Sequence, residues 1–188
     1  YTEANSWQYS FHVQHDIGGL MEASGGDSSF EEWLDELFST SSRTSGREQA
    51  DMTGMIGQYV QGNEPSHHIA YLYNYAGVPW KTQRVVRQIM EELFTSRPDG
   101  LCGNEDCGQM SAWYVLAAVG LHPLCPGDPR TEITSPVFEE ITIRTDPGYA
   151  SGKDFVIKAV NNSPENIYIQ SARLNGNPYD LCRLTYKD

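Results

Sequence analysis

The sequence predicts a mainly α-helical fold with a small β appendage at its C-terminal end. Up to residue 122, apolar residues recur at helical spacing between breaks that contain Gly or Pro. After Pro123, short segments alternate apolar and polar residues, which is typical of half-buried strands. With 188 residues, the chain is long enough for one domain plus a small appendage. We therefore divide it into a helical part, residues 1–122, and a β region, residues 123–188.

The first elements are predicted from aromatic spacing and capping residues. Trp7 and Phe11 lie four positions apart and indicate a helix that ends near residues 15–16. Asp16 can cap a short following turn, which closes at the Gly25-Gly26 pair.

A clear amphipathic helix comes next. Ser29 and Glu32 have the spacing of a capping box and place its start. Its apolar face consists of Phe30, Trp33, Leu34, Leu37 and Phe38. Residues 40–46 are rich in Ser and Thr and predict a surface loop.

Three further helices are expected, each ended by a Gly or a Pro. The first covers Ile69 to Tyr75 and stops at Gly77. The second is stopped before Pro98, and its apolar stripe is Val85, Val86, Ile89, Met90 and Leu93. The third runs from Met110 to Val119 and ends at Gly120. Helices separated by polar loops in this way are typical of antiparallel helix pairs.

The β region contains three segments with strand alternation, at residues 141–143, 155–159 and 167–169. Asn175-Gly176 predicts a tight hairpin turn between Leu174 and Tyr179. Three or four strands alone would be only marginally stable. We therefore expect them to pack on the helical part or to join a sheet formed by sequence outside this chain.

The composition excludes two classes of partner. Acidic residues outnumber basic ones 25 to 13, which gives a net charge of −12 without any Lys/Arg cluster, so we expect no nucleic-acid binding. No stretch approaches the roughly 18 apolar residues of a membrane span. The four cysteines do not have zinc-site spacing; Cys102 and Cys107 could bridge across the turn between them or remain free.

Two polar, Gly-bracketed turns stand out, at residues 62–68 and 103–111. Each carries carboxylates and amides and then enters an apolar helix, a costly arrangement unless the polar groups have partners or a use. In the first turn, Glu64 can cap a helix or, with the Asn63 amide, contact a hard cation such as Ca²⁺. Of the adjacent His67 and His68, we expect one to face a pocket and the other to be structural.

The second turn contains adjacent carboxylates, Glu105 and Asp106, of which only one is expected to point inward. Glu3 lies near Trp7, where apolar surroundings would favour a protonated acid. Two carboxylates in different environments are the usual equipment of a glycosidase.

On these residues the sequence resembles glycoside hydrolase family 92, the calcium-dependent exo-α-mannosidases. The resemblance covers roughly residues 1–143, and the segments that carry it are YTEANSWQY at 1–9, GNEPSHHIAYLY at 62–73, PWKT at 79–82 and GNEDCGQMSAWY at 103–114. It implies the last part of an (α/α)6 barrel followed by C-terminal antiparallel strands. It also implies an N-terminal β-sandwich partner that this chain lacks, and a periplasmic, cell-surface or secreted location.

The resemblance implies an inverting α-mannosidase, preferring α-1,2 or related linkages, that removes terminal mannose from mannose-containing glycans. Glu3 would be the general acid and Asp106 the general base, about 6.5–9.5 Å apart. Asn63 and Glu64 are the expected Ca²⁺ ligands, where the ion would hold mannose O2 and O3. Substrate contacts are expected from Glu64, His67 and Asn104; Asn104 stands where some relatives carry a second acid.

Two alternatives remain open at this point. One is an inverting (α/α)6 glycosidase that acts on another sugar, because residue spacing does not specify the sugar. The other is a non-catalytic carbohydrate-binding or structural module, whose sugar binding would be indifferent to Glu3 and Asp106.

Overall fold

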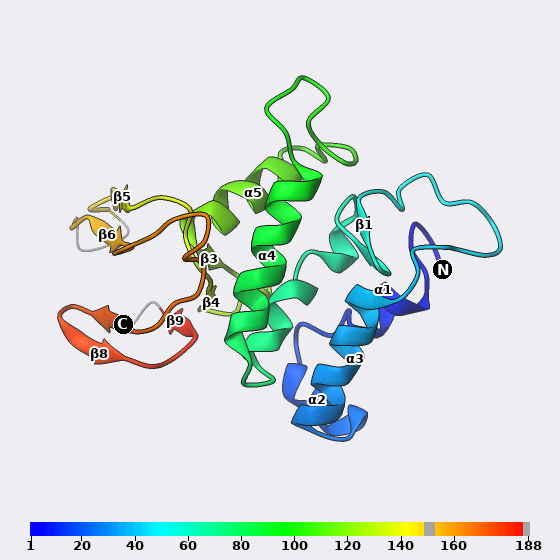
Figure 1. Ribbon diagram of the computed structural model, residues 1–188, viewed down its shortest axis with the longest axis horizontal. Helices are drawn as coiled ribbons and strands as arrows, with labels where there is room; N and C mark the ends of the chain where they lie inside the picture. Colours follow the sequence, from blue (N-terminus) through cyan, green and yellow to red (C-terminus); the bar gives the residue numbers. More distant parts are fainter. Residues whose placement is uncertain (149–152, 186–188) are drawn as a thin grey trace.

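The computed structural model describes residues 1–148 and 153–185 and shows a helical body beside a group of short strands (Figure 1). The helices, including the 3-10 helices η1 and η2, are α1 Ser6–Ser10, α2 Ile17–Ser24, α3 Asp27–Ser39, η1 Glu64–Ser66, η2 Ile69–Asn74, α4 Pro79–Leu93 and α5 Gln109–Val119. The strands are β1 Met55–Ile56, β2 Tyr59–Val60, β3 Leu121–His122, β4 Arg130–Ile133, β5 Glu140–Ile143, β6 Phe155–Lys158, β7 Ala172–Leu174, β8 Asn177–Tyr179 and β9 Arg183–Thr185. All the described helices thus precede residue 122, while the division into two domains at that point stays a prediction.

The first helix is shorter than predicted. It ends at Ser10 rather than near residues 15–16, because Phe11 leaves the helix to enter the core, where it is fully buried with its ring 4.1 Å from that of Trp33. Asp16 does act as a cap: its carboxylate accepts a hydrogen bond from the Gly19 N–H at 2.9 Å. The element that it caps is the two-turn helix α2 rather than a short turn.

The predicted capping box of the next helix is wrong. Helix α3 begins at Asp27, with Gly26 at its N-cap, so Ser29 lies inside the helix. The Gly25-Gly26 pair moves the start forward because both residues have positive φ, 102° and 96°, which glycine adopts readily. A capping box that the sequence reading missed lies at α1, between Asn5 and Gln8.

The later helices follow the prediction closely. Helix α4 contains the predicted apolar stripe and ends at Leu93, before Pro98, and α5 ends at Gly120, whose φ of 84° is a left-handed C-cap. The segment after the first polar turn is helical as predicted, although as the 3-10 helix η2. In the described residues no helix is long and apolar enough to cross a membrane.

The strands form several small antiparallel sheets. The predicted strands at residues 141–143 and 155–159 are confirmed as β5 and β6, which pair with each other, and the Asn175-Gly176 turn between β7 and β8 is confirmed as well. The predicted strand at residues 167–169 is wrong; the Ile169 N–H instead donates to Gln83 Oε1 on α4 at 2.8 Å. The three-stranded sheet β3-β4-β9 was not predicted, because its strands have two to four residues and two of them lie far apart in the chain.

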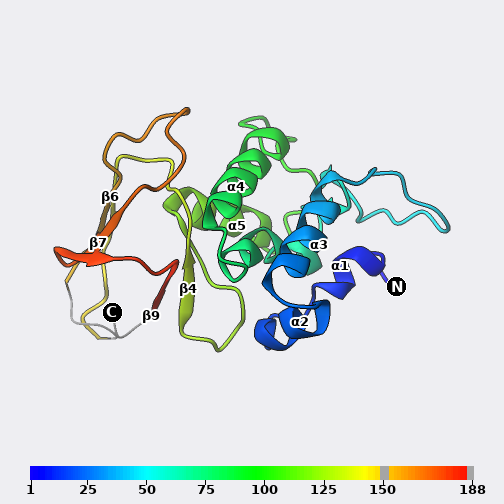
Figure 2. The same ribbon diagram turned by 60° about the horizontal axis from the view of Figure 1, so that its bottom comes forward.

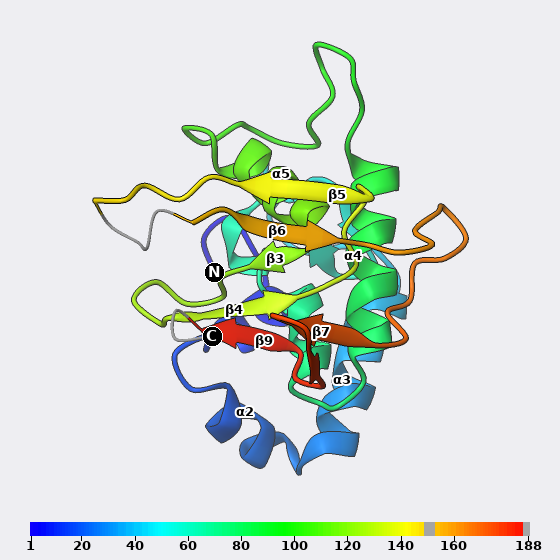
Figure 3. The same ribbon diagram turned by 90° about the vertical axis from the view of Figure 1, so that its left-hand side faces the viewer.

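Strands β3 to β9 lie across one side of the helical body, whereas β1 lies near α1 and the N-terminus (Figure 1). In Figure 3 they run in front of α4 and α5, and Figure 2 shows these two helices between the strands and α1 to α3. Sheet β3-β4-β9 is tied to the helices by Asn74 of η2, whose amide nitrogen donates to Glu132 Oε2 at 2.9 Å. The same nitrogen lies 3.2 Å from the Ile133 carbonyl oxygen and 3.3 Å from that of Cys182.

Candidate active site

The two polar turns lie against each other. A Cβ atom added to Gly103 would lie 2.8 Å from the carbonyl oxygen and 2.9 Å from the Cα of Gly62. A Cβ atom on Gly62 would in turn meet the Cys102 carbonyl oxygen at 3.1 Å. Glycine at both positions therefore allows the two backbones to approach, and the carboxylate-bearing turns become neighbours.

The N-terminal segment joins the first turn through Asn63. The Asn63 amide nitrogen donates to the Glu3 carbonyl oxygen at 2.7 Å, and its Oδ1 accepts from the Glu64 N–H at 3.1 Å. Asn63 is 6% exposed, whereas the Glu3 and Glu64 side chains are exposed. Residues more than 60 positions apart are thus brought together by one buried amide.

The second turn separates its two carboxylates by role. Glu105 accepts from the Ser111 N–H at 2.9 Å and from the Ser111 hydroxyl at 2.8 Å, so it caps the start of α5. Asp106 is exposed and does not take part in this capping. Of the pair, Glu105 therefore has a structural role that Asp106 does not share.

Both predicted catalytic residues have left-handed backbones. Glu3 has φ of 59° and Asp106 has φ of 51°, and the next residue, Cys107, has φ of 57°. In the described residues, the other non-glycine residues with positive φ are Asn161 and Asn175, of a residue type that tolerates this region well. Strained backbones of this kind cluster at functional sites, where the surrounding structure must hold them.

The ring of His67 links Gln61, just before the first turn, to Gln109 of the second turn. Its Nε2 lies 2.8 Å from the Gln61 carbonyl oxygen and therefore carries the proton, and its Nδ1 accepts from the Gln109 amide at 3.1 Å. Burial lowers the pKa of His67, and the nearby charges of Glu64 and Asp106 raise it by less. Both carboxylates thus lie close enough to affect the same imidazole.

His68 is buried like His67, so neither histidine is seen to face a pocket. It is 3% exposed, and its Nε2 lies 2.6 Å from the Phe11 carbonyl oxygen. Burial lowers its pKa to about 4.

Asn104, another predicted substrate contact, is exposed in the second turn. Sequence reading missed Gln109, because one glutamine at the start of an apolar helix gives no signal of a contact with a histidine 42 positions away.

The cysteines do not brace the second turn. Cys102, Cys107, Cys125 and Cys182 are all free. The sharp backbone from Asp106 to Gly108 is instead held by main-chain hydrogen bonds, in which the Gly108 and Met110 N–H groups donate to the Glu105 carbonyl oxygen at 3.2 Å each.

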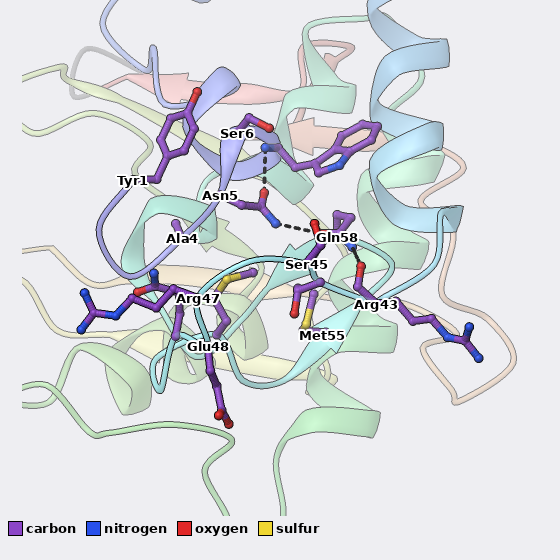
Figure 4. A pocket seen from close by; sticks show the side chains of 14 residues that line it. Tyr1, Ala4, Asn5, Ser6, Arg43, Ser45, Arg47, Glu48, Met55 and Gln58 are labelled. Atoms are coloured by element: carbon purple, nitrogen blue, oxygen red, sulfur yellow. Dashed lines mark hydrogen bonds between the residues drawn. The ribbon is translucent and has the colours of Figure 1, made fainter.

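A cavity of about 640 Å³ lies beside the Glu3 segment, between the N-terminal residues and the loop at residues 43–58 (Figure 4). Its lining includes Tyr1, Ala4 and Asn5 on one side and Arg47 and Gln49 on the other. The predicted catalytic, substrate and metal residues do not line it.

The oxygens of the first turn fit calcium chemically but do not complete a site. Calcium takes six to eight oxygen ligands, typically carboxylates, carbonyls and water. Glu64 offers an exposed carboxylate, and Asn63 Oδ1 keeps one lone pair after accepting from the Glu64 N–H. No group of three His, Cys, Asp or Glu side chains gathers around a common point in residues 1–148 and 153–185. These two residues could thus provide only part of a coordination shell.

A family comparison identifies the arrangement. The model of the glycosyl hydrolase family 92 catalytic domain matches residues 1–188. The chain belongs to glycoside hydrolase family 92. The chain spans only about a quarter of the length of the two solved relatives described next, so it is a portion of the family's catalytic region.

Two solved structures of family 92 enzymes are similar over nearly the whole chain. One is an α-mannosidase from Bacteroides thetaiotaomicron in complex with mannoimidazole; it is 40% identical, with a TM-score of 0.89 over 98% of this chain and 24% of that one. The other is an inverting mannosidase from Bacteroides thetaiotaomicron VPI-5482; it is 38% identical, with a TM-score of 0.82 over 100% of this chain and 26% of that one.

A curated relative comes from the fungus Arthroderma benhamiae. It is described as an uncharacterized secreted glycosidase and is 33% identical over 179 residues, which are 94% of this chain and 21% of the relative. The similarity therefore extends to a protein that is described as secreted.

Proposed function

We propose that this chain provides the acid and base residues of an inverting exo-α-mannosidase, which removes terminal mannose from α-1,2-linked or related mannose-rich glycans. The observation that carries the proposal is the convergence of three segments. Asn63 joins the Glu3 segment to the first turn, and the paired glycines join the first turn to the second. The segments that carry Glu3, Glu64 and Asp106 are therefore neighbours, although they lie in three different parts of the sequence.

In the proposed reaction, the Glu3 carboxyl donates its proton to the glycosidic oxygen while the bond to the anomeric carbon breaks. The Asp106 carboxylate accepts a proton from a water molecule that attacks the same carbon from the opposite face. This mechanism requires about 6.5–9.5 Å between the two carboxyl groups, enough for the water. The product then carries the inverted anomeric configuration.

Three neighbouring residues have supporting roles in the proposal. Glu64 and Asn104, both exposed beside the two turns, would bind sugar hydroxyls. His67 would act mainly by orienting Gln109 and the second turn, because both of its ring nitrogens already have protein partners.

Calcium would be held in part by Glu64 and Asn63. When bound, the ion supplies positive charge and coordination sites for sugar hydroxyls. The remaining ligands would come from water, the glycan and residues outside this chain. We also propose that the complete catalytic domain is an (α/α)6 barrel with an N-terminal β-sandwich partner, and that the enzyme works outside the cytoplasm, as the described location of the fungal relative suggests.

The test uses the full-length protein and its Glu3→Gln and Asp106→Asn variants. We expect each variant to lose roughly 100- to 10,000-fold in kcat on an α-1,2-mannobiose substrate, the usual contribution of a positioned acid or base. Proton NMR of the first product formed should show β-mannose from the α-linked substrate. Full activity in either variant would refute the assigned role, and α-mannose as first product would refute the inverting mechanism.

A further inference from the structure

We propose that Gln49 and Asn63 are positioning residues that hold the Glu3 backbone in the orientation needed for proton donation. The inference rests on the proposed role of Glu3 as the general acid. It assigns a function to two side-chain amides, one of which lies in a polar loop that carries no recognisable catalytic motif.

The two amides bind Glu3 from both sides of its Cα. The Glu3 N–H donates to Gln49 Oε1 at 3.2 Å, and the Glu3 carbonyl oxygen accepts from the Asn63 amide nitrogen at 2.7 Å. One bond fixes the peptide plane before Glu3, and the other fixes the plane after it. Together they hold the φ of 59°, which a residue with a side chain rarely adopts on its own.

A third amide anchors both the helix after Glu3 and the loop that carries Gln49. Gln58 is 3% exposed, and its Oε1 accepts from the Asn5 amide at 2.8 Å, a contact visible in Figure 4. Its Nε2 donates to the carbonyl oxygens of Ser41 at 2.6 Å and Arg43 at 3.3 Å. The Gln8 amide donates to the Gln58 carbonyl oxygen. The Glu3 segment is therefore fixed to residues 41–63 largely by side-chain amides.

Neutral amides suit this task for an electrostatic reason. A general acid must keep its proton until the transition state, and a nearby positive charge would lower its pKa, whereas a nearby negative charge would raise it. Amide side chains supply both a donor and an acceptor without a net charge. They can thus fix the geometry of Glu3 and leave its protonation to the rest of the site.

The experiment measures how strongly the rate depends on the leaving group, because general acid catalysis matters most for poor leaving groups. In the full-length enzyme, kcat/KM is measured for aryl α-mannosides from 2,4-dinitrophenyl to unsubstituted phenyl. We expect Gln49→Met, which removes the acceptor, to lose roughly 10- to 100-fold on the phenyl substrate, the scale on which misplaced groups lose rate. On the dinitrophenyl substrate the loss should be small.

Conservative replacements and a neighbour supply the controls. Gln49→Glu keeps an acceptor oxygen and should recover most of the loss of Gln49→Met. Glu48→Gln changes the exposed neighbouring residue and should behave like the unmodified enzyme. Asn63→Asp removes the donor to the Glu3 carbonyl oxygen but keeps an oxygen that can bind calcium. In this variant, kcat/KM should depend more steeply on the leaving group, while the calcium affinity measured by calorimetry is retained. Circular dichroism checks that every variant is folded.

The Glu3→Gln variant separates failure of the inference from failure of the proposed function. If Glu3→Gln shows no added leaving-group dependence, Glu3 is not the acid and both proposals fall. In the other outcome, Glu3→Gln shows a steeper leaving-group dependence, but Gln49→Met and Asn63→Asp lose activity equally on all substrates or lose none. That outcome overturns the positioning role alone.

Discussion

In the helical part, many buried aromatic and aliphatic side chains pack together, among them Tyr71 and Trp113. Among the described residues after 122, the buried apolar side chains are Leu124 and Pro136. The β region contacts the helical core through Leu124 and Val137 and is further attached by polar contacts. Asn74 binds Glu132 and two carbonyl oxygens, and Arg183 lies 4.2 Å above the ring of Tyr75. Apolar burial thus stabilises one region, and specific polar bonds help to attach the other to it.

This difference bears on the candidate site. The two polar turns and the Glu3 segment all belong to the helical part, where a close-packed core leaves little freedom to shift. The turns themselves are held by hydrogen bonds and glycine contacts at the edge of that core. The packed interior therefore supports a surface on which strained backbones can persist.

The largest effect should come from removing a side chain at the centre of the helical core. Trp113 is 1% exposed, lies parallel to Phe94 with ring centroids 5.9 Å apart, and donates to the His67 carbonyl oxygen at 3.0 Å. We expect Trp113→Ala to lower the local free energy of unfolding by about 3–5 kcal/mol. Native-state hydrogen exchange of the full-length protein measures this, with Val156→Ala on the exposed face of β6 as the control. Equal losses in the two variants would contradict the comparison.

The next largest effect should come from breaking the polar attachment of the β region. Asn74→Ala removes one donor from the buried Glu132 carboxylate and from the carbonyl oxygens of Ile133 and Cys182. Glu132 keeps its hydrogen bond with the Tyr75 side chain, and the Cys182 carbonyl keeps the Ile133 N–H at 2.8 Å. We expect about 1.5–3 kcal/mol lower stability, the contribution of a hydrogen bond to a charged group. The loss should be concentrated in β4 and β9, where hydrogen exchange should become faster. Uniform destabilisation that includes α3 would show that the two regions unfold as one unit.

Acid should weaken the helical part selectively. Burial lowers the pKa of His68 to about 4 and that of His122 to about 3, both below the ordinary value of 6.5. The unfolded chain therefore binds these protons first, so stability is full above pH 6.5 and falls as the pH drops below it. At pH 5 each histidine should cost about 2 kcal/mol.

The histidine effect is tested by substitution. His122 stacks on Tyr71 with ring centroids 4.4 Å apart and 7° between the planes, so His122→Phe should preserve the packing. The variant should lose about 2 kcal/mol less stability than the unmodified protein between pH 7 and pH 5. An unchanged pH dependence would mean that His122 is protonated in the folded state. Every histidine of the chain lies at or before residue 122, so the β region should not share this acid sensitivity directly.

The smallest effect is expected on the surface of the β region. Lys158 and Glu140 form an ion pair at 3.3 Å across β5 and β6, with side chains 67% and 58% exposed. Water screens such a pair, so Lys158→Ala should change stability by no more than about 0.5 kcal/mol, and the change should vanish in 1 M salt. A loss similar to that of Asn74→Ala would show that exposed ion pairs also hold this region.

The sequence by itself determined the elements whose ends depend on local chemistry. Pro79 starts α4 and Gly120 ends α5, because Pro fits the first turn of a helix and Gly tolerates a left-handed cap. The Asn175-Gly176 turn is local for the same reason. Motif spacing likewise pointed to the family, and the family model matched the chain.

Only the tertiary structure decided the features that depend on distant partners. Residues 167–169 have strand alternation but bind α4 instead, and β4 finds its partner β9 some 50 positions later. The left-handed backbone of Glu3 follows from Gln49 and Asn63, which lie 46 and 60 positions away. The sequence can name the carboxylates of the site, because carboxylates are rare beside apolar helices. It cannot show which backbones are strained, because the hydrogen bonds that hold them form only when the chain is folded.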